Sequence, residues 1–115
     1  MLFFATALFA IAAAIGFFLL LYVLQKKNTH KGVAFTHGSI AAVGLIILIG
    51  YAVLYQPAPI VSMIIFILAA LGGVTLIFRD LTGRSLPRWL AIGHGLTAAV
   101  GLIFLIFFIF VHFIL

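Results

Sequence analysis

The sequence predicts an all-α protein, a transmembrane four-helix bundle built from two tandem two-helix repeats. Three observations predict this fold class. Hydrophobic residues make up 68% of the 115 residues and charged residues only 6%, a composition outside the range of soluble globular domains. Four apolar runs are each long enough, at about 20 residues, to cross a bilayer. The second and fourth runs begin with nearly the same sequence.

The four apolar runs fill most of the chain, so we expect a single membrane domain, residues 1–115, with no extramembrane domain. No basic residue precedes the first run, which predicts a retained span rather than a cleaved signal peptide. The fourth run, Leu90 to Leu115, would form a helix roughly 38 Å long and must tilt or protrude at its C-terminal end. The expected helices cover about residues 2–24, 33–55, 60–78 and 88–115.

The repeat is clearest where residues 37–49 return as residues 94–106, at an offset of 57 residues and without a gap. Only three of the aligned pairs differ. We therefore expect repeats at about residues 1–57 and 58–115, related by a pseudo-two-fold axis along the membrane normal. The alternative is chance similarity between apolar helices. The same offset aligns the first run with the third, placing Phe9, Ala12 and Gly16 over Phe66, Ala69 and Gly73.

The six basic residues all lie in or beside two connections, the first-to-second and the third-to-fourth. Because cytoplasmic loops carry an excess of Lys and Arg, we expect loops 25–32 and 79–87 in the cytoplasm. Both termini are then periplasmic, in what we expect to be a bacterial inner membrane. This distribution accounts for the net charge of +5 and argues against nucleic-acid binding. Asp80, the only acid, is expected in the second loop, in a solvated contact with Arg79 or Arg84.

The chain contains no cysteine, which excludes disulfides, thiolate metal sites and the covalent attachment of a c-type haem. It also has no paired carboxylates, no activated nucleophile and no phosphate-binding loop. Hydrolytic and group-transfer enzymes therefore have no support in the sequence.

His37 and His94 are the main candidate functional residues. An ionisable side chain within a membrane helix is energetically costly and normally faces the bundle interior. The pseudo-two-fold axis would bring both imidazoles to one depth, about one helical turn inside the cytoplasmic interface. Two imidazoles that approach a common centre suit the axial positions of one haem iron. The sequence therefore predicts one haem b per chain, with these two histidines as iron ligands.

Small residues follow each histidine on its own helix face, at i+4 and i+7, where they would leave room for a flat macrocycle. Three cations at the nearest membrane edge are expected to face the propionates. The expected macrocycle walls are Ala41, Gly44, Ala98 and Gly101, with added backbone clearance at Gly38 and Gly95. The expected propionate partners are Lys31, Arg84 and Arg88.

Other interpretations of the histidines remain open. A membrane histidine can simply hydrogen-bond across helices. Zinc or copper is less well supported because no third ligand is visible nearby. His112 lies 18 residues after His94, on the same face but near the opposite membrane surface. With Tyr51 and Tyr55 it is a candidate for a second site, such as a quinone head-group pocket, and an interfacial aromatic belt is the alternative.

A four-helix membrane unit with histidines on alternate helices resembles the b-type membrane cytochromes, including the cytochrome b561-like proteins. The resemblance implies electron transfer, either alone or as a subunit with other membrane redox subunits or a second copy. Those proteins often carry a second ligand pair, and here Tyr55 stands at the position that pairs with His112. Small multidrug transporters are similar in span number, but their mechanism needs an acid that the first run lacks. The competing hypothesis is a cofactor-free scaffold or accessory subunit.

Overall fold

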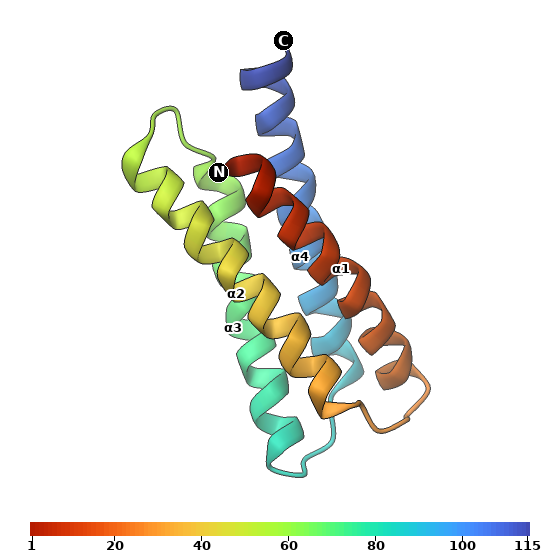
Figure 1. Cartoon of the computed structure of the whole chain (residues 1–115). Helices are drawn as coiled ribbons and strands as arrows, with labels where there is room; N and C mark the ends of the chain where they lie inside the picture. Colours follow the sequence, from red (N-terminus) through yellow and green to blue (C-terminus); the bar gives the residue numbers. More distant parts are fainter.

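The computed structural model describes all 115 residues and consists of four long helices packed as a bundle (Figure 1). Each of the four is long and apolar enough to cross a membrane. The prediction of a small all-α membrane protein with four spans is confirmed. The helices are α1 Leu2–Leu24, α2 Lys31–Leu54, α3 Ile60–Leu81 and α4 Arg88–Ile109, and a π-helical turn η1, Phe110–Ile114, continues α4.

The helices form two hairpins, because α1 packs along α2 and α3 packs along α4. The hairpins meet in two seams of unequal extent, a broad one between α1 and α4 and a narrower one between α2 and α3. The loops 25–30 and 82–87 lie together at one end of the bundle (Figure 1). The N-terminus and the α2–α3 connection lie at the other end, and α4 with η1 extends beyond them.

The two loops are shorter than the sequence predicts. The helix α2 begins at Lys31 rather than residue 33, and α3 continues to Leu81 rather than residue 78. Asp80 is therefore part of a helix, and its expected place in a loop is wrong. The physical reason is that lipid offers the backbone no hydrogen bonds, so the helices run to the membrane edge and end in compact caps.

Buried side chains concentrate between the hairpins, in the half of the bundle away from the two loops. Phe9 of α1 stacks on Phe66 of α3, with ring centroids 3.8 Å apart and planes 4° from parallel. The outer faces expose large apolar side chains such as Phe17 and Ile46, as a lipid-facing surface requires. The core cluster consists of Leu2, Ala5, Phe9, Leu48, Phe66, Leu105 and Ile109.

Candidate functional site

His37 of α2 and His94 of α4 face each other across the interface between the hairpins. Their ring centroids are 6.1 Å apart, and their planes are nearly perpendicular at 89°. Both side chains are half-buried. Two residues 57 positions apart in the sequence thus form a single pair inside the bundle, on the loop side of the Phe9–Phe66 stack.

Each imidazole is held by the neighbouring helix of its own hairpin. Nδ1 of His37 donates to the carbonyl oxygen of Ala12, and Nδ1 of His94 donates to that of Ala69, both at 2.8 Å. A carbonyl oxygen can only accept, so the hydrogen bond assigns the proton to Nδ1 in each neutral ring. In this tautomer Nε2 of each ring is left with the lone pair, the form in which imidazole binds a metal.

Two glycines make these hydrogen bonds accessible. A helical carbonyl points toward the residue four positions later, and four residues after Ala12 and Ala69 come Gly16 and Gly73. An added Cβ on Gly16 would lie 2.8 Å from Cε1 of His37, and one on Gly73 would lie 3.0 Å from Cε1 of His94. Any larger residue would displace the imidazole. This role of Gly16 was not predicted, although its spacing from Ala12 and its match with Gly73 are visible in the sequence.

The small residues expected beside the histidines have several environments. Gly44 lies against the ring of Phe9 and Gly101 against that of Phe66, with an added Cβ 3.3 Å and 3.2 Å from the nearest ring atoms. These two glycines therefore make room for the phenylalanine stack. Gly38 has no neighbouring atom within 4 Å of an added Cβ, whereas the nearest atom to Gly95 is Cδ2 of Leu20 at 3.9 Å. Ala41 and Ala98 are half-buried.

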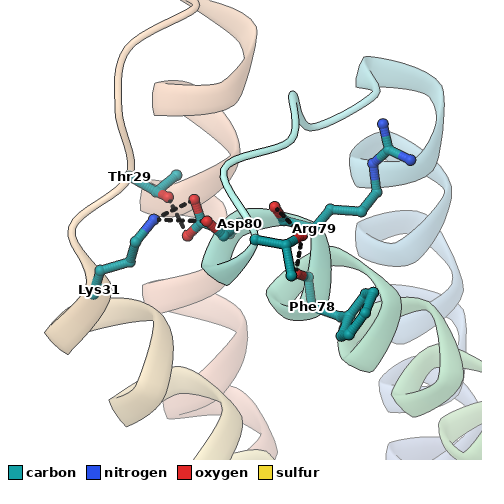
Figure 2. A network of polar contacts seen from close by, with 6 residues as sticks. Thr29, Lys31, Phe78, Arg79 and Asp80 are labelled. Carbon is teal, nitrogen blue, oxygen red and sulfur yellow. Dashed lines mark hydrogen bonds and ion pairs between the residues drawn. The ribbon is translucent and has the colours of Figure 1, made fainter.

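The three cations expected near the propionates have different partners. Lys31 forms an ion pair with Asp80, which also accepts a hydrogen bond of 2.8 Å from the hydroxyl of Thr29 (Figure 2). A guanidinium nitrogen of Arg88 donates to the carbonyl of Leu24 at 3.3 Å. Arg84 is exposed in the loop.

The expected pairing of Asp80 with Arg79 or Arg84 is wrong. Asp80 lies in the last turn of α3, where its carboxylate faces the start of α2. Arg79, one residue earlier, is about 100° away around the helix. Its Nε donates instead to the carbonyl of Ser85 within the same hairpin, at 2.9 Å.

The possible second site lies at the end of the bundle away from the two loops. Tyr51 and His112 line a shallow hollow of about 210 Å³, and Tyr55 packs beside Tyr51 with centroids 4.9 Å apart but outside the hollow. His112 is exposed, stacks on Phe108 and donates from Nδ1 to the Phe108 carbonyl at 2.9 Å. The other residues lining the hollow are Gln56, Pro57, Phe108 and Phe113.

No group of three or more His, Cys, Asp or Glu residues comes together, so the histidine pair would offer a metal two imidazole nitrogens and no third protein ligand. Structural zinc normally takes four protein ligands, whereas haem iron needs the protein only at its axial positions. The donor set therefore fits a haem better than a free ion. Comparison with models of protein families, with curated proteins and with solved structures finds no match for this chain.

Proposed function

We propose that this protein is a small b-type membrane cytochrome that binds one haem b between His37 and His94 and transfers electrons, alone or within a larger membrane complex. The observation that carries the proposal is the pair of facing imidazoles, 6.1 Å apart, each with Nδ1 bonded to a backbone carbonyl. Haem bound there supplies reversible one-electron chemistry at its iron.

The separation of the rings supports a shared metal. Two imidazoles on one ion, each with a metal–nitrogen distance of about 2.0 Å, have ring centroids roughly 6 Å apart. The observed 6.1 Å agrees with this value. Ligation would therefore require little change in the distance between the histidine rings.

The carbonyl hydrogen bonds support the same role. A metal-binding histidine almost always donates its other ring N–H to a carboxylate, a carbonyl or water, which fixes the ring and raises the basicity of the ligand. Ala12 and Ala69 provide such a carbonyl to His37 and His94. The apolar bundle around the pair limits water access, and burial of this kind tunes a haem potential.

Matching contacts in the two hairpins support an origin by duplication, with a pseudo-two-fold axis along the membrane normal. Each histidine hydrogen bond and each ring of the phenylalanine stack recurs at the offset of 57 residues, and so do Gly16 and Gly73, the glycines against Cε1 of each imidazole. On this proposal the haem lies near the axis, and the loop end of the bundle faces the cytoplasm.

The test is a spectrum of the protein purified in detergent after expression with a haem supply. We expect a Soret band and a sharp α-band on reduction. We also expect a strongly anisotropic low-spin electron paramagnetic resonance (EPR) signal, because perpendicular imidazoles bond to different iron d orbitals and keep those orbitals close in energy. The substitutions His37→Ala and His94→Ala should each abolish this low-spin signal.

His112→Ala is the matched control, because His112 is also on the fourth span but is exposed and far from the pair. It should leave the spectrum unchanged. A colourless wild-type protein would reject the haem proposal and favour a cofactor-free scaffold, in which the two histidines only tie helices together. A low-spin signal that persists in both His37→Ala and His94→Ala would reject the ligand assignment.

A further inference from the structure

Each histidine ring is fixed within its own hairpin. His37 is bonded to Ala12 of the first hairpin, and His94 is bonded to Ala69 of the second. Neither imidazole ring has a hydrogen bond to the backbone of the opposite hairpin. The distance and angle between the rings therefore depend on how the two hairpins dock.

The two hairpins dock through contacts on both sides of the His37–His94 pair, one set toward the Phe9–Phe66 stack and one toward the loops. On one side, Phe9 stacks on Phe66, and each ring comes three residues, or about 4.5 Å of helix rise, before the carbonyl that holds a histidine. On the loop side, Arg88 contacts the carbonyl of Leu24 across the α1–α4 seam. The α2–α3 seam on the loop side is closed by Asp80.

Asp80 receives two side-chain contacts from the first hairpin. Its Oδ1 pairs with Nζ of Lys31, and its Oδ2 accepts from the hydroxyl of Thr29 at 2.8 Å (Figure 2). Nζ of Lys31 also reaches the backbone carbonyl of Asp80, at 3.3 Å. The Asp80 side chain is 14% exposed and that of Lys31 50%, so the carboxylate end of the pair is shielded from water while the ammonium end stays open to screening by salt.

We propose that Asp80 is a positioning residue: through Lys31 and Thr29 it closes the α2–α3 seam and thereby sets the distance and angle between His37 and His94. The seam is the narrower of the two, and Asp80 is the only acid in the chain, so no other carboxylate can replace the contact. The effect on docking is independent of any cofactor. Its effect on redox properties rests on the haem proposal.

The first test measures docking in the protein without haem. The chain has no cysteine, so spin labels on Thr36→Cys of α2 and Phe78→Cys of α3 are the only labels present. Both positions are exposed and lie on opposite sides of the seam. Pulsed EPR should give one narrow distance distribution in the parent and a broader, longer one in Asp80→Asn.

Arg79→Gln is the matched control. It removes the 2.9 Å hydrogen bond from Arg79 to the carbonyl of Ser85, which lies within the second hairpin and does not cross the seam. It should leave the distribution narrow. Thr29→Val removes only one of the two side chains that donate to Asp80, so its distance distribution should be of intermediate width. This variant provides the test if Asp80→Asn fails to fold. The exchange Lys31→Asp with Asp80→Lys should restore the narrow distribution.

The second test uses the haem protein. Asp80→Asn should keep the haem but shift the g values and the midpoint potential, whereas Arg79→Gln should change neither. Unchanged distances in both Asp80→Asn and Thr29→Val would overturn the positioning role even if haem binds. Absence of haem in the parent would instead overturn the proposed function, and the distance test would still decide the role of Asp80.

Discussion

At the scale of single residues, the histidine pair depends on four glycines, whose lack of a Cβ leaves room for neighbouring rings. Gly16 and Gly73 expose the carbonyls that hold the histidines, and Gly44 and Gly101 admit the phenylalanine stack. The histidines themselves were predictable, because an ionisable group repeated at one offset within apolar helices is rare without a reason. The residues around them were not, since a small residue in a membrane helix packs equally well against a ring, another helix or lipid.

Gly16→Ala should lower thermal stability and remove the low-spin signal. The added methyl would lie 2.8 Å from Cε1 of His37, so the ring must turn away and lose its bond to Ala12. Overpacking of this kind typically costs about 1–3 kcal/mol. Thermal unfolding in detergent, followed by circular dichroism, would measure the loss.

Gly38→Ala is the control for that substitution, because it changes a glycine next to His37 that has nothing within 4 Å of an added Cβ. It should raise stability by up to about 1 kcal/mol through better helix propensity. Equal stability of the two alanine variants would contradict the packing seen at Gly16.

At the scale of elements, α1 and α3 end in the same way. After α1, Lys26 takes a left-handed conformation with φ of 56°, and the N–H of Lys27 bonds to the carbonyl of Tyr22 at 2.9 Å. After α3, Gly83 has φ of 74°, and the N–H of Arg84 bonds to the carbonyl of Arg79 at the same distance. Both are Schellman caps, but only the second has the glycine that this conformation favours.

Lys26→Gly should therefore stabilise the protein. A left-handed conformation costs a residue with a Cβ about 1–2 kcal/mol, and glycine avoids that cost at the expense of some unfolded-state entropy. We expect a net gain of about 1 kcal/mol, seen as a higher midpoint of thermal unfolding. Lys27→Gly, which removes a neighbouring loop lysine without left-handed geometry to relieve, should give no gain. A gain of the same size in both variants would mean that loss of charge, and not the backbone, is responsible.

At the scale of the whole molecule, the two hairpins should be coupled through Phe9 and Phe66. Their rings stack across the interface at 3.8 Å, so a double-mutant cycle with alanine at each position should give a coupling of about 0.5–1.5 kcal/mol. Unfolding in mixed micelles would measure it. The pair Phe18 and Tyr22, which interact within α1 alone, is the comparison for a contact that does not join hairpins. Additive effects of the Phe9 and Phe66 substitutions would contradict energetic coupling across the interface.

The orientation of the bundle can be tested with single cysteines, because the chain has none of its own. We expect Gln56→Cys, in the α2–α3 connection, to react with a membrane-impermeant maleimide in intact cells. Asn28→Cys, in the first loop, should react only after permeabilisation, since the basic loops are expected in the cytoplasm. The reverse pattern would overturn that orientation.

The sequence by itself determined the four spans and the helical class, and it marked His37 and His94 as the candidate pair. Hydropathy and length decide a span directly, and lipid leaves a spanning backbone no alternative to a helix or a closed barrel. The tertiary structure alone decided which faces meet: the phenylalanine stack, the carbonyls bonded to the histidines, and the contact of Asp80 with Lys31. The physical reason is that these helices are apolar on every side, so no amphipathic stripe marks the inward face. Only the fit of side chains between helices selects it.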